Sequence, residues 1–290
     1  MEVTTMTKIV PAPDDPGCFV VVSGETEQSF VDPNDPLRLE FEYVQRIAEI
    51  LDVSVLDQPR SGPLRVVHVG GGGMTIPRYI HARRPGVSQT VLEPDADLIE
   101  DVRRIIPFPS RGSLQVRNID GAAGMATMPS GWVDVLIVDA FAGAQVPGDL
   151  VTTAFFAEAV RLLRTDGILI MNVTDTAPFE WSKRALAGLV RYSPNVGVIS
   201  EVPIWKGRRF GNLILVAGTE IPVAALSRRL ASAAFPQRLV GGEALLEWIG
   251  TALPFTRHDT EPSPEPNWGK TWFGPRRHKG DDLDDLDDVE

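Results

Sequence analysis

The sequence predicts an α/β protein whose central sheet is mainly parallel, with helices on both faces. Three observations lead to this prediction. Short apolar, β-branched runs alternate with segments of helical spacing, and a repeated βαβ order requires parallel strands joined by crossover helices. Glycines occupy positions 70–73, directly after the first of these buried runs in the α/β part. Acidic residues follow several of the runs, at the strand ends where such sheets bind ligands.

The stretch 64–93 contains the clearest of these patterns. Residues 65–69 form an apolar strand, and the glycines that follow let the backbone turn tightly and approach a ligand, because they have no Cβ. Residues 76–84 can form the crossover helix, and residues 90–92 the next strand. Glu93 ends that strand, roughly 20 residues past the turn, where a carboxylate can accept both hydroxyls of a ribose. The alternative is an ordinary tight turn with a surface glutamate.

The N-terminal part is expected to be a small β-rich unit. Residues 1–17 are proline-rich without apolar periodicity, and we expect a flexible arm. Residues 18–23 and 26–31 then predict a β-hairpin. A linking helix is expected over residues 37–51, where apolar residues share one face. The predicted N-terminal domain, the hairpin plus this helix, therefore covers residues 18–58.

The second predicted domain, residues 59–255, is a Rossmann-like nucleoside-binding domain. Asp120 and Asp139 each follow a predicted strand, as Glu93 does. The further strands are expected at residues 113–116, 133–138, 167–173, 196–203 and 212–217. The further helices are expected at residues 95–106, 150–163, 181–190, 224–234 and 242–253. Residues 256–290 are predicted to be a Pro/Trp-rich segment and a disordered acidic tail.

Length and composition exclude several classes of protein. The chain has 290 residues, of which 43% are hydrophobic, as expected for one large α/β domain with a small appendage. No apolar run approaches the ~18 residues of a membrane-spanning helix, and the N-terminus lacks the pattern of a signal peptide. The single cysteine, Cys18, excludes an internal disulfide and a cysteine-built metal site. We therefore expect a cytoplasmic protein without membrane contact and without a metal.

The net charge of −11 is concentrated at the C-terminus. Seven acidic residues lie in the last ten positions, so the rest of the chain is only mildly acidic. The clustered basic face that nucleic acid requires is lacking, and we expect no nucleic-acid partner. The acidic tail is predicted to be disordered and solvated. In the alternative, it docks on the basic residues 276–279.

The acidic residues at the strand ends together predict a nucleoside pocket. Glu93 is expected to bind the ribose and Asp120 the exocyclic amine of adenine, with a backbone N–H near Gly121 facing a ring nitrogen. The turn Gly70, Gly71 and Gly72 leaves room for a polar tail. The turn lacks the spacing that binds a pyrophosphate, so S-adenosylmethionine or a related sulfonium nucleoside fits better than a dinucleotide. The alternative is that Asp120 and Asp139 only cap turns.

Four segments give the sequence a resemblance to the spermidine synthase (polyamine aminopropyltransferase) family, in a divergent, actinobacterial-type branch. The matching segments are VVHVGGGG, VLEPD, NIDG and VDVLIVDAF, together with Gln28 and the Phe41-Glu42-Tyr43 run, within residues 19–217. The resemblance implies a class I methyltransferase-like Rossmann domain after an N-terminal β-hairpin domain. It also implies aminopropyl transfer from decarboxylated S-adenosylmethionine to a diamine such as putrescine, in a homodimer or tetramer.

The resemblance assigns roles to individual residues, and two departures from the family pattern qualify them. Gln28 is implied to contact the nucleoside, Tyr43 to lie in the active site, and Asp139 to be the first aspartate of the family's D-[ST]-[ST]-D-P motif. The aspartate of the family's GGGDGG motif, which contacts the aminopropyl amine, is Gly73 here. The second aspartate of D-[ST]-[ST]-D-P, the general base, is Ala142.

Three functions follow from this combination of matches and departures. The first is an atypical transferase that moves an alkyl (aminopropyl) group from an S-adenosyl sulfonium donor to an amine, with Asp139 as base or amine anchor. The second is a catalytically silent homologue that keeps the nucleoside pocket or only the fold. The third is a small-molecule methyltransferase, which would not require an aspartate at position 73.

Overall fold

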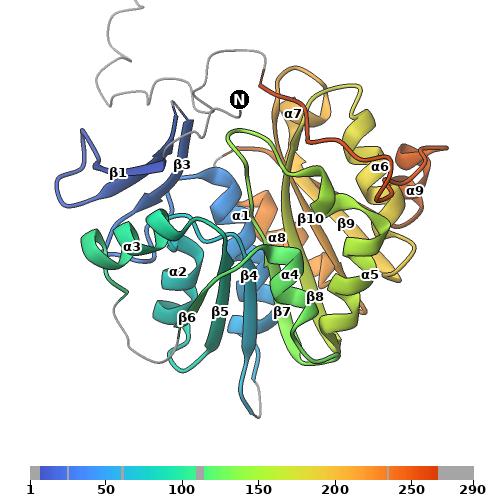
Figure 1. The fold of residues 1–290 in the computed structure, drawn as a ribbon. Coiled ribbons are helices and arrows are strands. Elements are labelled where there is room, and N and C mark those ends of the chain that lie inside the picture. Colours follow the sequence, from blue (N-terminus) through green and yellow to red (C-terminus); the bar gives the residue numbers. More distant parts are fainter. Residues whose placement is uncertain (1–6, 25, 60–61, 109–113, 234, 267–290) are drawn as a thin grey trace, which may run out of the picture.

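The computed structural model describes residues 7–24, 26–59, 62–108, 114–233 and 235–266. It contains a small antiparallel sheet and a larger one surrounded by helices (Figure 1). The small sheet consists of β1 (Thr7–Pro11), β2 (Phe19–Ser23) and β3 (Thr26–Val31). The large sheet consists of β4 (Arg65–Val69), β5 (Ser88–Glu93), β6 (Leu114–Asn118), β7 (Val133–Val138), β8 (Leu163–Asp175), β9 (Asn195–Glu201), β10 (Gly211–Gly218) and β11 (Gln237–Gly241).

The helices are distributed along the whole described chain. They are α1 (Glu42–Leu51), α2 (Thr75–Arg83), α3 (Ala96–Ile105), α4 (Gly121–Ala126), α5 (Thr153–Leu162), α6 (Glu180–Leu189), α7 (Val202–Trp205), α8 (Val223–Ala231) and α9 (Gly242–Ile249). A π-helical turn, η1 (Asp52–Leu56), continues α1, and a 3₁₀ turn, η2 (Gly148–Val151), precedes α5. No helix within the described ranges is long and apolar enough to cross a membrane.

The central sheet confirms the predicted α/β class. Its strand order is β11-β9-β10-β8-β7-β4-β5-β6. The five strands from β8 to β6 pair in parallel, whereas β10 is antiparallel to both β8 and β9, and β11 is antiparallel to β9. All side chains of β7 are buried, which explains why five of its six residues are apolar; the exception, Asp134, accepts the N–H of Arg65. The parallel strands end at one edge of the sheet, the upper edge in Figure 1.

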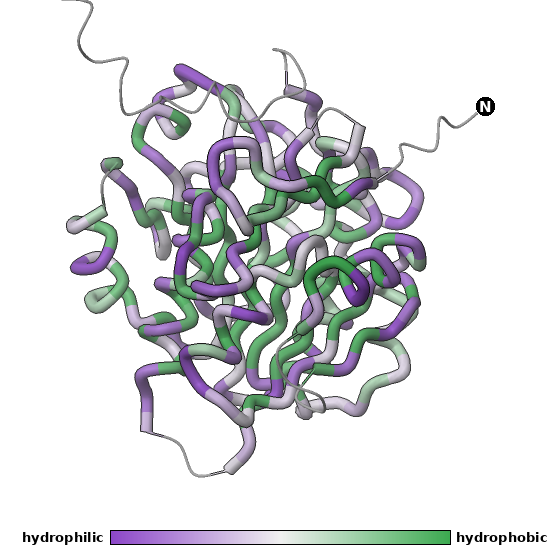
Figure 2. The backbone as a smooth tube through the Cα atoms, turned by 90° about the vertical axis from the view of Figure 1, so that its left-hand side faces the viewer, coloured by the Kyte–Doolittle hydropathy of each residue, from purple (hydrophilic) through white to green (hydrophobic). Residues whose placement is uncertain are grey.

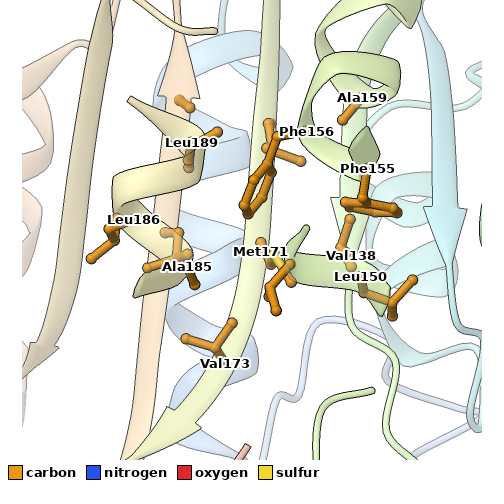
Figure 3. Packing of buried hydrophobic residues seen from close by; sticks show 14 of the residues in the cluster. Val138, Leu150, Phe155, Phe156, Ala159, Met171, Val173, Ala185, Leu186 and Leu189 are labelled. Carbon is orange, nitrogen blue, oxygen red and sulfur yellow. The ribbon is translucent and has the colours of Figure 1, made fainter. Parts of the chain in front are cut away.

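Two apolar layers hold the helices against the sheet. One face packs on α4, α5, α6 and α9, with Phe156 and Leu186 among its buried residues (Figure 3). The other face packs on α1, α2 and α8, with Ile47 and Ile80 fully buried. Hydrophobic stretches run through the inside of the molecule, and hydrophilic turns lie at its periphery (Figure 2). The confirmed two-sided covering leaves the carboxyl edge of the sheet as the place for a ligand.

The small sheet lies beside that edge and differs in one strand from the prediction. The expected hairpin is present as β2 and β3. Thr7–Pro11, which belongs to the segment predicted as a flexible arm, instead forms β1 and pairs with β2. Because β1 is only partly buried, its sequence lacks the apolar alternation that would have identified it. A third apolar cluster, which includes Val21, Val31 and Val102, joins this sheet to α3.

Other differences concern element ends and short elements. The linking helix begins at Glu42 rather than at residue 37, and α9 ends at Ile249, where Gly250 adopts a positive φ of 61°. The edge strand β11 and the short helix α4 were not expected from the sequence. The predicted acidic tail, the basic residues 276–279 and the tryptophans after residue 266 lie outside the described residues.

Candidate active site

A cavity of about 290 Å³ opens at the carboxyl edge of the central sheet, between that edge and the small sheet. Its wall combines the glycine turn after β4, the ends of β5 and β7, the start of α1 and strand β3. All nine site residues that the sequence predicts line this one cavity: Gln28, Tyr43, Gly70, Gly71, Gly72, Glu93, Asp120, Gly121 and Asp139. The fold therefore brings together residues that are more than a hundred positions apart, although their individual roles remain predictions.

The glycine turn is packed so closely that one of its positions accepts no side chain. Gly70 has a φ of +91°, and a Cβ there would collide with the carbonyl oxygen of Asp139. Gly70 also donates its N–H to the carbonyl of Leu92 (2.9 Å), and Asp139 donates its own to Val69 (2.9 Å). These bonds fix the turn between the ends of β5 and β7. A ligand seated on the turn consequently lies next to Asp139.

Two backbone N–H groups, one before and one after Glu93 in the chain, fix its carboxylate by hydrogen bonds. Its Oε2 accepts the N–H of Gly71 at 2.9 Å, and its Oε1 accepts that of Asp95 at 3.0 Å. Burial raises the pKa of Glu93, and these backbone hydrogen bonds oppose the rise. Each carboxylate oxygen keeps a second lone pair, so a fixed, largely buried Glu93 can still accept the two hydroxyls of a ribose.

Asp120 caps a helix and also lines the cavity. Its Oδ1 accepts the N–H of Ala123 at 3.0 Å, which makes it the N-cap of α4. The side chain is exposed at the rim, two residues beyond the end of β6. Asp120 therefore acts as a cap, as the alternative interpretation of the sequence expected. It nevertheless lines the cavity beside Gly121, where it was predicted to recognise adenine.

Asp139 is the partly buried carboxylate at the end of β7. The amide of Asn172 on β8 donates to its Oδ1 at 3.0 Å, and the hydroxyl of Tyr43 donates to the same carboxylate. Burial raises the pKa of Asp139 to about 6, and both hydrogen bonds limit the rise. At neutral pH the group is therefore mostly ionised, yet it binds a proton more tightly than an ordinary aspartate does. These are the properties of a general base.

Tyr43 and Gln28 connect the N-terminal part to the loop that follows Asp139. Burial and the neighbouring Asp139 raise the pKa of Tyr43 well above its usual range, so its phenol stays neutral. Its hydroxyl also lies 3.4 Å from the carbonyl of Gln28. The Gln28 side chain donates to the carbonyl of Gly143 at 2.8 Å. Gln28 therefore holds the loop over the cavity.

The two positions that depart from the family pattern carry no charge and differ in their surroundings. A Cβ on Gly73 would lie 2.6 Å from Cγ2 of Val31 and 3.2 Å from Cγ2 of Val21, so side chains of the small sheet fill that space. Gly73 donates its N–H to Ser29 (3.1 Å), also on β3. Ala142, in contrast, is exposed on the loop after β7 and lines the cavity. Position 73 is closed, whereas position 142 has room for a larger side chain.

Asn172 was missed in the sequence, although a signal was present. It is a polar residue within the apolar strand GILIMNV, and it is only 1% exposed. Its Oδ1 accepts the amide of Asn212 on β10 at 2.9 Å, which fixes the orientation in which Asn172 donates to Asp139. A buried polar residue requires a partner, so a polar residue within an apolar strand was a sign of such a contact, although the sequence does not identify the partner.

The charged side chains among the described residues that line the cavity are all acidic. Among the described residues that line it, there is neither a lysine nor an arginine. Burial lowers the pKa of His68, the histidine in the wall, to about 4, so its ring is neutral. The carboxylates in the wall are Glu40, Glu93, Asp95, Asp120, Asp139 and Asp149. The site therefore attracts cations and offers no counter-charge to a carboxylate of a ligand.

Comparison with known proteins gives matches in sequence and in fold, but no family model matches the chain. Polyamine aminopropyltransferases match from Neisseria meningitidis (29% identical; 38% of this chain, 42% of the relative) and Vibrio vulnificus (26%; 55% and 52%). One from Chromobacterium violaceum is 26% identical over 52% of this chain and 56% of its own. The aligned part thus spans about half the length of these curated relatives.

Solved structures match over more of the chain. A probable spermidine synthase from Corynebacterium glutamicum has a TM-score of 0.80 and 26% identity, over 88% of this chain and 94% of its own. Human methyltransferase-like protein 13, solved with SAH, has a TM-score of 0.53 at 19% identity, over 67% and 94%. The second likeness concerns the fold alone and agrees with the methyltransferase-like Rossmann fold expected from the sequence.

Proposed function

The chain belongs to the spermidine synthase family, and from this premise we propose that it transfers an aminopropyl group from a sulfonium nucleoside to an amine. The observation that carries the proposal is Asp139: a partly buried carboxylate with a pKa of about 6, in contact with Tyr43 and adjacent to the glycine turn. A general base requires this proton affinity and this access to the reacting atoms.

The nucleoside half of the site supports the donor. Glu93 binds the ribose hydroxyls, and Asp120 binds the adenine amine at the rim. The turn 70–72 supports the sulfonium, whose positive charge faces the carboxylate of Asp139. Decarboxylated S-adenosylmethionine suits the cavity better than S-adenosylmethionine does, because a methionine carboxylate would meet no lysine or arginine among the described residues of the wall. This electrostatic argument disfavours the methyltransferase alternative.

The reaction needs one proton transfer and one displacement. The acceptor enters as an ammonium ion, and Asp139 takes one of its protons. The nitrogen lone pair then attacks the carbon attached to sulfur. A C–N bond forms and the C–S bond breaks with its electron pair on sulfur, which releases neutral 5′-methylthioadenosine. The product leaves as a secondary ammonium ion, and Asp139 returns its proton to solvent. Tyr43 and Asn172 hold the carboxylate through these steps.

One observation favours a second candidate, a nucleoside-binding protein without transferase activity. Val31 and Val21 fill the space beside Gly73, and the described atoms nearest to a Cβ there belong to Val31, Ser29 and Val21 rather than to a carboxylate that could hold the ammonium of an aminopropyl tail. A buried or partly buried cation without a partner is unfavourable by several kcal/mol. Such a protein would keep Glu93 and Asp120 as nucleoside ligands and bind donor and product with similar affinity.

Calorimetry and a product assay separate these candidates. Titration of decarboxylated S-adenosylmethionine, S-adenosylmethionine and 5′-methylthioadenosine ranks the ligands, and release of 5′-methylthioadenosine with an amine reports transfer. We expect the decarboxylated donor to bind more tightly than S-adenosylmethionine and Asp139→Asn to slow release by about 10²- to 10⁴-fold. Binding without release for any amine would support the nucleoside-binding candidate. Binding of none of the three ligands would contradict both.

A further inference from the structure

The cavity has an apolar side that the nucleoside does not use. Beyond Asp139, six apolar residues of the wall come from the following loop, from η2 and from the position just before α1. These residues are Phe41, Ala140, Phe141, Ala142, Pro147 and Leu150. The side chains of these six residues contain only carbon and hydrogen. They therefore offer a ligand van der Waals contact and apolar burial but no hydrogen-bond partner.

Carboxylates are unevenly distributed around this apolar side. Glu93, Asp95 and Asp120 lie at the ends of β5 and β6, on the side assigned to the nucleoside. Glu40 is exposed and pairs with Arg38 at 3.2 Å, and Asp149 is exposed on η2 at the rim. Among the described residues that line the cavity, Asp139 is thus the one carboxylate that is both partly buried and next to the apolar wall.

We propose that the acceptor is a primary amine with a single amino group on an uncharged, apolar body. This inference rests on the proposed aminopropyl transfer. The amino group lies against Asp139 and Tyr43, and the body lies against Phe41, Phe141 and Pro147. A second ammonium group of a diamine would lie against carbon atoms without a counter-charge. A carboxylate on the acceptor, as in an amino acid, would meet no cation in the described wall.

The apolar wall also favours the chemical step. An alkyl ammonium ion in water has a pKa near 10, well above that of Asp139, so proton transfer to Asp139 is unfavourable there. Removal of the ammonium from water lowers its pKa, while burial has already raised that of the carboxyl. The two proton affinities approach each other in this cavity. A diamine gains less from this effect, because its second charge keeps water close to the first.

Turnover with a panel of amines tests the proposal. Release of 5′-methylthioadenosine from decarboxylated S-adenosylmethionine is measured with hexylamine, phenethylamine, putrescine and 4-aminobutyrate. We expect kcat/KM for hexylamine or phenethylamine to exceed that for putrescine by about tenfold or more, and 4-aminobutyrate to be inactive. A preference for putrescine would overturn the inference while leaving aminopropyl transfer in place.

A binding experiment decides the inference even if no amine is turned over. Hexylamine and putrescine are titrated into the full chain saturated with 5′-methylthioadenosine. Tighter binding of hexylamine, by about tenfold, is the expected result, and tighter binding of putrescine contradicts it. Absence of turnover together with this preference would overturn the proposed transfer, but not the apolar acceptor side.

Three variants make the charge argument specific. Ala142 is exposed on the loop and lines the cavity, so Ala142→Asp adds a carboxylate to the apolar wall without disturbing the core. We expect it to raise putrescine affinity about tenfold or more relative to hexylamine, and Ala142→Asn not to do so. Asp149→Asn addresses the exposed carboxylate at the rim. A marked loss of putrescine affinity in this variant would mean that Asp149 binds the second ammonium, and would overturn the proposal.

Discussion

Replacing Asp139 with asparagine is expected to stabilise the protein above about pH 6 while removing its proposed base. The pKa of Asp139 is about 6 in the folded chain, compared with 3.8 for the free side chain. The folded state therefore binds the carboxyl proton more tightly than the unfolded state does. An asparagine has no such proton, and its carbonyl can still accept from Asn172 and Tyr43.

The size and pH range of the effect follow from these two pKa values. Below pH 3.8 the carboxyl is protonated in both states and contributes no penalty. As the pH rises from 3.8 to about 6, the unfolded state loses its proton first, so the folded state loses relative stability. Above that range the penalty is constant. At ~1.4 kcal/mol per pKa unit it amounts to about 3 kcal/mol, an upper value because the side chain is only partly buried.

Urea unfolding at several pH values measures this effect. Near the lower pKa, the free energy of unfolding of Asp139→Asn should equal that of the unsubstituted chain. At pH ~8 it should be higher by up to about 3 kcal/mol, with an unchanged m-value. Asp14→Asn is the matched control for a surface substitution, since Asp14 is exposed in the turn between β1 and β2 and should change the free energy of unfolding by less than ~0.5 kcal/mol. An equal gain at both ends of the pH range, or a loss at the higher pH, would refute the assignment of Asp139 as a partly buried carboxylate with raised proton affinity.

Three further substitutions test other parts of the site. Glu93→Gln replaces the carboxylate bound by the N–H groups of Gly71 and Asp95, and should weaken 5′-methylthioadenosine binding about tenfold or more by calorimetry. Gly73→Asp should destabilise the chain by at least about 1–3 kcal/mol in urea unfolding, because its side chain would overlap Val31. Ser263→Ala leaves the N–H of Val146 (2.9 Å from Ser263 Oγ) without its hydrogen-bond partner. It should lower the free energy of unfolding by about 1–3 kcal/mol, which a lower melting temperature would report.

Much of the fold could be predicted because the sequence pattern is local. The buried strands β4 and β7 consist mainly of β-branched residues, and each is followed by a residue predicted to contribute to the site at the sheet edge. Parallel strands bring their carboxyl ends together, so Glu93 and Asp139 were expected at one site before any contact was known. The pattern fails for β1, since an edge strand that is only partly buried carries little periodicity.

The supporting contacts of the site could not be predicted in the same way, because they join distant segments. Asn172 was recognisable as a polar residue in an apolar strand, but its bond to Asp139 depends on the register between β7 and β8. Ser263 is fully buried and accepts the N–H of Val146, in the loop that covers the cavity. Nothing near Ser263 in the sequence indicates this contact, which arises only after the C-terminal segment packs on the loop.

Position 73 illustrates how the structure changes the meaning of a single residue. In the sequence, Gly73 stands where the resemblance to the spermidine synthase family implies an aspartate, which suggests a lost charge with space left behind. In the structure the space is filled by Val31 and Val21, so the glycine and the two valines depend on one another. Restoring the aspartate alone would create overlap rather than an amine-binding site. The change thus removes an anchor for the donor's tail but leaves Asp139, with its proton affinity, in place. Under the proposed aminopropyl transfer, donor recognition and proton transfer would thus depend on different residues, and weak donor binding alone would not argue against catalysis.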